Sequence, residues 1–197
     1  MNKAFAEVIA SSLTSWLAQS WQWDLFPAFG SLVVVPQGER TLIGIIHQIT
    51  TGSLDPMRTP FAYQKTEEEL SKEQPQIFEF LKTTFSCWVM GYQENGAFYY
   101  QLAPNPPKIH AFVYNASSQF YKDFFADQRY LHLLFSHASQ SPSHEELLLA
   151  LLALRAQHQA LSSKDLVGMA ETFCLLTGND YKRLKIFLHR AQALITQ

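Results

Sequence analysis

The sequence is poor in charged residues, which make up 16% of its 197 residues, against roughly 25% in typical domains. Aromatic residues reach 14%, so we expect part of the surface to be apolar and to be covered by a partner or a second copy. The formal net charge of -2 also lacks the basic excess that general binding to nucleic acid or to an anionic membrane requires. Any binding of that kind needs a local basic patch.

Cysteine and long apolar runs are scarce as well. The two cysteines, Cys87 and Cys174, lie far apart and form no metal-binding or redox spacing, which is typical of free thiols in a reducing compartment. The richest apolar run, at 147–157, is shorter than the roughly 20 residues of a membrane span. Glu7 and several serines interrupt the N-terminal apolar stretch, unlike a secretory signal. We therefore expect a cytoplasmic protein with no transmembrane segment.

Motifs of catalysis and cofactor binding are missing. The sequence has no Gly-Lys dipeptide for a phosphate-binding loop, no G-x-G-x-x-G pattern and no nucleophile elbow. The "HEELL" stretch at 144–148 lacks the second histidine of a zinc-binding helix. We predict no catalytic residue, no metal site and no cofactor, and therefore no enzyme. A ligand or enzymatic site built from convergent polar groups in a deep pocket stays open as an alternative.

The first half of the chain has the composition of β structure. Branched and aromatic runs separated by Gly, Pro and Asn predict strands at 32–35, 42–49, 85–92, 97–102 and 109–114. Asn95 and Gly96 predict a tight hairpin between two of these runs. The run at 42–49 is apolar on both faces, which is typical of a barrel strand covered by another element, and Gly44 would relieve crowding there. His47 and His110 are interpreted as hydrogen-bonded residues of this wall.

Helical signals occur between these strands and throughout the second half. Thr66 and Glu69 form a capping-box pattern, and Pro75 suits the start of a second short helix. We expect this segment to turn its apolar residues toward the barrel, namely Leu70, Ile77, Phe78 and Leu81. Capping residues and Gly178 indicate about four later helices: one within 118–135, and others starting near Ser143, Ser162 and Asn179. The stretch at 7–23 fits a helix or strands equally.

Three segments, at 29–63, 66–92 and 102–114, together resemble the HAS-barrel proteins, named for the barrel shared by HerA-type translocating ATPases and ATP synthase subunits. The form that they resemble is a stand-alone protein of cyanobacteria and related photosynthetic lineages. The resemblance implies that residues 7–19 form the opening strands of the barrel and that a helix follows residue 65. It also implies protein contact, since the barrel helps ATPase subunits to meet. Hydrolysis and translocation do not carry over, because this sequence contains no P-loop.

The predicted fold is therefore α+β: a small closed six-stranded antiparallel β-barrel over 1–116, with an inserted helical segment at about 66–84, and a helical domain over 117–197. The predicted function is an interaction or assembly module that contacts a larger complex, such as an ATPase ring or an energy-transducing assembly, or a second copy. The expected contact residues are Asp55, Arg58, Tyr63, Pro107 and Lys108, although Asp55 and Arg58 would equally brace each other across a turn. The alternative is a nucleic-acid-binding barrel that uses aromatic residues and the basic last helix, with Lys182, Arg183, Lys185 and Arg190.

Overall fold

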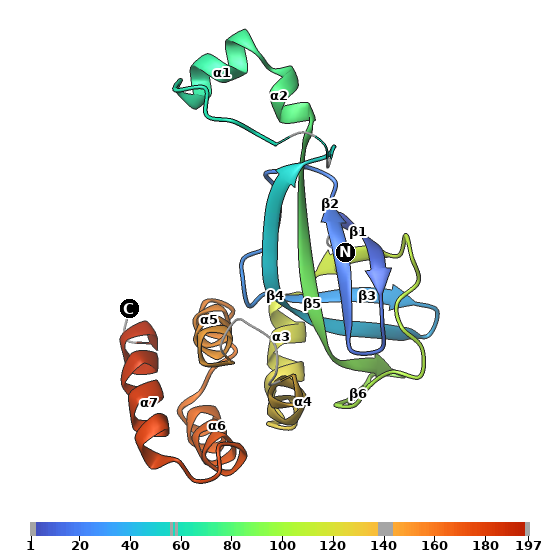
Figure 1. Ribbon diagram of the computed structural model, residues 1–197. Coiled ribbons are helices and arrows are strands. Elements are labelled where there is room, and N and C mark those ends of the chain that lie inside the picture. Colours follow the sequence, from blue (N-terminus) through green and yellow to red (C-terminus); the bar gives the residue numbers. More distant parts are fainter. Residues whose placement is uncertain (1–2, 56, 58, 138–143, 196–197) are drawn as a thin grey trace.

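The core of the molecule is an antiparallel β-barrel closed by a pairing between its second and fifth strands (Figure 1). The computed structural model describes residues 3–55, 57, 59–137 and 144–195. Residues 193–195 are described by their backbone alone. Six strands form the barrel in the order β2-β1-β7-β3-β4-β5, and a short strand, β6, extends the sheet beyond β5. The predicted α+β fold with a closed six-stranded barrel is confirmed. The strands are β1 (Ala6–Ser11), β2 (Ser15–Ser20), β3 (Leu32–Gln37), β4 (Arg40–Ser53), β5 (Leu81–Glu94), β6 (Ala97–Tyr99) and β7 (Phe112–Asn115).

Strands β3, β4 and β5 are apolar on both faces because one face fills the barrel and the other meets the helices. The side chains that pack inside the barrel include Val33, Val35, Leu42, Ile46, Phe85 and Cys87. The side chains that alternate with them pack outward against the helical layer: Leu32, Val34, Ile43, Ile45, Trp88 and Met90. This arrangement confirms the prediction that the strand at 42–49 is covered on its outer side.

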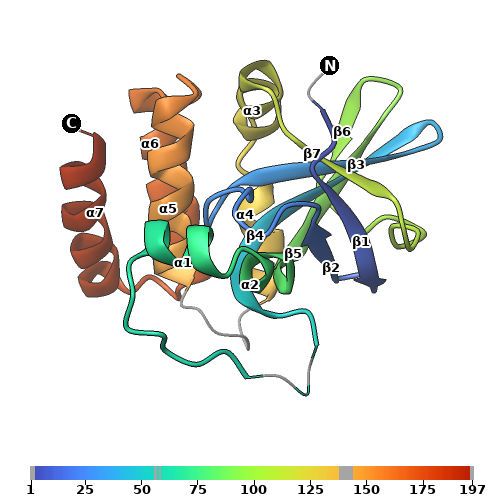
Figure 2. The same cartoon turned by 90° about the horizontal axis from the view of Figure 1, so that it is seen from above.

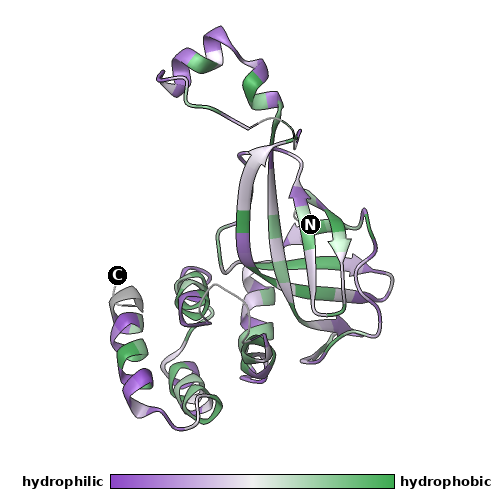
Figure 3. Cartoon of the chain, in the orientation of Figure 1, coloured by the Kyte–Doolittle hydropathy of each residue, from purple (hydrophilic) through white to green (hydrophobic). Residues whose placement is uncertain are grey.

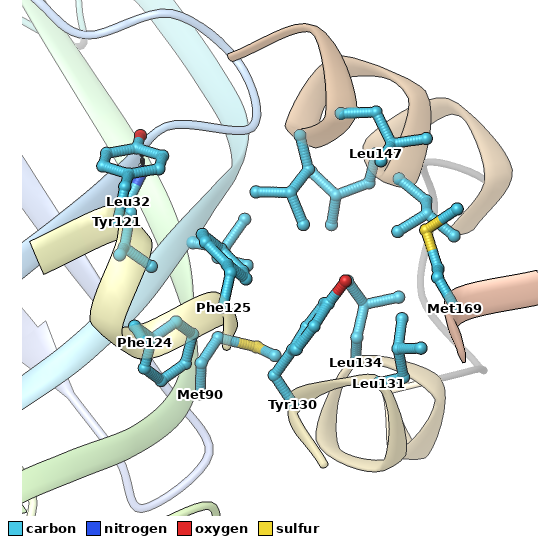
Figure 4. Packing of buried hydrophobic residues seen from close by; sticks show 14 of the residues in the cluster. Leu32, Met90, Tyr121, Phe124, Phe125, Tyr130, Leu131, Leu134, Leu147 and Met169 are labelled. Carbon is cyan, nitrogen blue, oxygen red and sulfur yellow. Dashed lines mark hydrogen bonds between the residues drawn. The ribbon is translucent and has the colours of Figure 1, made fainter. Parts of the chain in front are cut away.

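The helices of the second half lie on one side of the barrel (Figure 2). Helix α5 packs on α7, and five of its leucines are buried in a cluster that also contains side chains of α3, α4, α6 and the barrel (Figure 4): Leu147, Leu148, Leu149, Leu151 and Leu152. Where one helix is expected within 118–135, two form, and the carboxylate of Asp127 accepts the N–H of Arg129 at the break. The predicted start at Ser143 lies outside the described residues. The helices are α3 (Ser118–Phe125), α4 (Tyr130–Ser136), α5 (His144–Gln157), α6 (Ser163–Leu176) and α7 (Tyr181–Ile195).

Among the helices that the structure describes, none has the length and apolar character to cross a bilayer.

A buried arginine, Arg155, connects the helices of the helical layer to one another. Arg155 is 0% exposed, and its Nε donates to the Ala160 carbonyl at 3.0 Å while Nη1 donates to the Tyr130 hydroxyl at 3.2 Å. The guanidinium also lies 4.8 Å from the ring centre of Phe125 and 3.8 Å from a carboxylate oxygen of Asp165. This one side chain therefore ties α5 to the end of α3, to α4 and to the start of α6.

A hydrogen bond between a buried tyrosine and the backbone joins the helical layer to the start of β3. The backbone N–H of Leu32 donates to the hydroxyl of Tyr121 at 2.7 Å (Figure 4), and burial raises the pKa of that hydroxyl to about 12. Tyr121→Phe removes the acceptor and leaves a buried N–H unpaired, so we expect the free energy of unfolding to fall by about 1–2 kcal/mol. Denaturant unfolding measures this loss. Tyr181→Phe, at a tyrosine that is 72% exposed, is the control, and an equal loss there would contradict the assignment.

Candidate interaction surfaces

The described residues between β4 and β5 (54, 55, 57 and 59–80), here called the arm, project beyond one end of the barrel (Figure 1). The two strands pair as far as Ser53 and Leu81, and the N–H of Leu54 donates to the carbonyl of Phe80 at 2.7 Å. The arm contains α1 (Glu67–Glu73) and α2 (Gln76–Glu79), and neither helix has a buried residue. It is therefore a local structure that stands outside the core.

The expectation that the inserted helices turn their apolar residues toward the barrel is wrong for α1 but right for Phe78 of α2. Leu70 and Ile77 lie on helices that extend past the end of the barrel, and Leu81 belongs to β5. Phe78 reaches back to stack on Trp23, with ring centres 5.6 Å apart. The helical pattern is read correctly from the sequence, but the direction of the segment depends on how β4 and β5 leave the barrel.

Local hydrogen bonds hold the arm in shape without a core. The Thr66 hydroxyl accepts the N–H of Glu69 at 3.3 Å, and the Glu69 carboxylate accepts the N–H of Thr66 at 2.9 Å, which confirms the predicted capping box. Lys65 forms an ion pair with Glu73 across α1. Pro75 precedes the first residue of α2, as its fixed φ angle favours.

The arm presents apolar and acidic side chains to solvent (Figure 3). Met57 is 92% exposed and Phe61 is 69% exposed, and the Phe61 ring packs on Tyr63 at 4.4 Å rather than on the barrel. The charged residues of α1 and α2 are mostly acidic: Glu67, Glu68, Glu69, Glu73 and Glu79, against Lys72. Exposed apolar groups beside one sign of charge are typical of a surface that binds a partner.

The expected contact residues fall into two separate places. Asp55 and Tyr63 lie in the arm, where the Asp55 carboxylate accepts the N–H of Met57 at 3.0 Å. Arg58 lies outside the described residues. Pro107 is buried and Lys108 is exposed, and both lie beside the start of β4, because the Lys108 N–H donates to the side chain of Gln37 at 2.9 Å. The arm follows the other end of this 14-residue strand, so the structure does not bring the two groups together.

Lys108 borders a shallow hollow of about 380 Å³ at that end of the barrel. Arg40 and Glu94, which also line it, form an ion pair of 2.7 Å between β4 and β5. The hollow is open to solvent, and two of its charged groups, Arg40 and Glu94, are already paired with each other. These properties are not those of a ligand-binding site, which is typically enclosed and mostly apolar.

The four basic residues of the nucleic-acid alternative lie on α7, and all are exposed. Arg183 forms an ion pair with Glu145, and Arg190 forms one of 2.7 Å with Glu146, both on α5. These arginines therefore neutralise carboxylates and fasten α7 to α5. Lys182 and Lys185 add positive charge to the exposed side of the helix.

Three histidines surround the buried indole of Trp88 on the outer wall of the barrel. The ring centres of His47, His137 and His144 lie 4.4, 4.9 and 5.7 Å from that of Trp88, and all three rings stack within 24° of its plane. They come from β4, the end of α4 and the first residue of α5, so the cluster forms only when the helices cover the barrel. Each histidine is at most 8% exposed.

Burial keeps these histidines neutral. It lowers the pKa of His47 to about 4, with nearby His137 as the lesser cause. Burial is also the main cause of the lowered pKa of His137 and of His144; beside His144, Glu145 opposes the shift and Arg183 adds to it. Nδ1 of His47 and Nε2 of the other two have no hydrogen-bond partner among the described residues. A proton on any of these nitrogens would be a buried charge without compensation.

The sequence interpretation of the histidines is only partly right. His47 does lie in the wall, but its ring is held by stacking on Trp88 and its Nδ1 lacks a partner. His110 precedes β7 in a turn with φ of 65°, and its exposed ring lies 3.2 Å from the Glu7 carboxylate. The cluster with His137 and His144 is not evident in the sequence. The only sequence signal for the cluster is that His144 stands at the border of an apolar helical run, and this pattern is too common to predict a cluster.

The described residues carry no grouping typical of a metal centre. No set of three or more His, Cys, Asp or Glu side chains among them is arranged to hold a metal ion. Both cysteines are free and buried, as predicted, and burial raises the pKa of the Cys87 thiol, which opposes nucleophilic chemistry there.

In comparisons with known proteins, the chain matches no protein-family model and no curated protein sequence. The structure by itself defines an α+β protein: a closed antiparallel barrel with a helical layer on one side and a helical arm at one end.

Proposed function

We propose that this chain is a non-enzymatic interaction or assembly module that acts in the cytoplasm, with the arm as its main contact surface. The observation that carries the proposal is that α1 and α2 form without a buried residue, beside apolar side chains that water surrounds. Exposure of Met57 and Phe61 costs free energy that docking on a partner would recover.

The partner is proposed to be a larger complex, such as an ATPase ring or an energy-transducing assembly, or a second copy of the chain. The first class follows from the resemblance to HAS-barrel proteins. The acidic side chains of α1 favour a partner surface with apolar and basic groups. On α7, Arg183 and Arg190 already pair with carboxylates, which favours protein contact over the nucleic-acid alternative.

An armless variant tests this proposal. The ladder between β4 and β5 reaches Ser53 and Leu81, so an Asn-Gly pair in place of residues 55–79 closes a two-residue hairpin between Leu54 and Phe80. We expect this variant to keep the barrel, with a loss of about 1 kcal/mol from the Trp23–Phe78 stack. It should lose the partner that the intact chain captures. Circular dichroism and affinity capture measure the two effects.

Photo-crosslinking identifies which surface meets the partner. A crosslinking amino acid in place of Phe61 should form adducts in a lysate of the source organism, because that side chain is 69% exposed on the arm. The same amino acid in place of Val167, 59% exposed on α6, is the matched control. If the armless variant captures the same proteins as the intact chain, the arm is not the contact surface and the proposal is wrong.

A further inference from the structure

We infer that the arm of one copy binds a groove on α7 of a second copy. This inference rests on the proposed function, since it assigns a partner to the same surface. The groove, here called the α7 groove, has a volume of about 460 Å³. It is lined by Tyr181, Leu184, Lys185, Leu188, His189 and Gln192.

The α7 groove lies along the flank of the helix, and its outer part is open to solvent, since Tyr181, Lys185 and His189 are exposed. Its residues recur at intervals of three and four, so they share one side of the helix. The other side carries Phe187 and Ala191, which are 2% exposed and pack with the α5 and α6 layer. Leu184 and Leu188 at the inner border of the groove are half-buried and pack against the core cluster, whereas Tyr181 at its start is 72% exposed.

The charges of the two surfaces are complementary. The α7 groove is bordered by Lys185, with Lys182 one turn before it on the same helix. The first turn of α1 carries Glu67, Glu68 and Glu69. The arm extends from the end of the barrel while α7 lies at the outer edge of the helical layer, so Figure 1 shows the two surfaces apart within one chain. Their charges can meet only between copies.

The apolar parts of the two surfaces match as well. The apolar lining of the α7 groove consists of the exposed Tyr181 and of Leu184 and Leu188, whose half-buried side chains also pack against the core. The arm offers Phe61, which is 69% exposed, and Met57, which is 92% exposed. An aromatic ring and a flexible thioether are suited to filling an irregular apolar groove, and the acidic first turn of α1 would then lie over the lysines. One chain therefore carries both halves of an interface, which a second copy completes.

Reciprocal exchange of arms between two copies would bury both grooves and close a two-fold dimer. Dimerisation would then cover the exposed apolar side chains of the arm and those of α7 at the same time. This accounts for a low content of charged residues, 16%, in a chain whose own fold leaves both surfaces open.

Charge reversal tests the inference on the full chain. The arm variant is Glu67→Lys with Glu68→Lys; Glu69 stays because it caps α1. The α7 variant is Lys182→Glu with Lys185→Glu, and the control is Lys122→Glu with Lys164→Glu, two exposed lysines elsewhere. We expect the intact chain and the control to dimerise in sedimentation velocity. Each reversed variant should bind itself about tenfold more weakly, and an equimolar mixture of the two should regain the dimer.

The outcomes separate this inference from the proposed function. An intact chain that stays monomeric at the highest attainable concentration overturns the inference, as does a dimer that both reversals leave unchanged. If arm-dependent crosslinks to another protein persist in that case, the proposed function stands without self-association. Circular dichroism of each variant confirms that the altered charges leave the fold intact, so a lost dimer is not an unfolded one.

Discussion

Lowering the pH from 8 to 5 is expected to reduce the free energy of unfolding by about 2 kcal/mol through His47 alone. The cause is the difference between the pKa of His47 in the folded chain, about 4, and its ordinary value of 6.5. His137 and His144 have lowered pKa values as well, so they act in the same direction. Acid should therefore loosen the contact between the helical layer and the barrel, where all three rings meet Trp88.

The direction follows from proton binding. Between pH 6.5 and 4 the unfolded chain protonates His47 and the folded chain does not, so protons favour the unfolded state. Stability is fully present above the unfolded pKa and falls as the pH drops toward the folded value. Asp127, whose pKa is lowered chiefly by a hydrogen bond from Arg129, loses its contribution only below its ordinary 3.8. The window from 4 to 6.5 is therefore that of the histidines.

Denaturant unfolding at several pH values measures this effect. His47→Phe keeps an aromatic ring against Trp88 and removes the titrating group, so the fall between pH 8 and 5 should shrink by about 2 kcal/mol. The same substitution at the exposed His132 is the control and should leave the fall in place, because His47 is intact. A His47→Phe variant with the pH dependence of the parent chain would show that the cluster does not control acid stability.

Gly44→Ala is expected to destabilise the protein by about 2–3 kcal/mol, because the barrel has no room for a methyl group there. A Cβ atom at Gly44 would lie 2.3 Å from Cη2 and 2.4 Å from Cζ2 of Trp16, well inside van der Waals contact. Trp16 is 2% exposed and fills the barrel from β2, so its ring has little freedom to move. The sequence predicts that Gly44 relieves crowding in the barrel wall, and the structure shows that the crowding side chain is Trp16.

A double-mutant cycle isolates this clash. Trp16→Phe removes the ring atoms that meet the added methyl group, so Gly44→Ala should cost less in that background. Gly52→Ala is the matched control, since Gly52 lies on the same strand and a Cβ there meets nothing within 4 Å. If the loss at Gly44 is the same with either residue at position 16, contact with the indole is not its cause.

Much of the barrel is predictable because the residue pattern within each strand indicates a strand. The run at 42–49 has apolar residues on both faces, and only a strand between two apolar layers buries both. The N-terminal strands are a different case, since Trp16 and Leu17 suit a helix or a strand. They are strands here because β1 pairs with β7, and β2 pairs with β5 to close the barrel.

The candidate surfaces are predictable only in part. Asp55 and Tyr63 do lie on the projecting arm, but Pro107 is buried and Lys108 lies at the far end of β4. The composition of a loop shows that it is polar or rich in proline, but it does not predict which loop projects from the barrel. The histidine cluster is missed for a related reason: His47 and His137 are 90 residues apart in the chain but meet on one indole.

Local structure follows from the sequence alone: the capping box at Thr66, the helix start after Ser162, the end of α6 before Gly178 and the two-faced strand at 42–49. These features depend on residues within one or two turns of each other. The closure of the barrel, the direction of the arm and the cluster of histidines around Trp88 become visible only in the folded chain. Each of these depends on packing between segments far apart in the chain, where the same residue pattern is compatible with several arrangements.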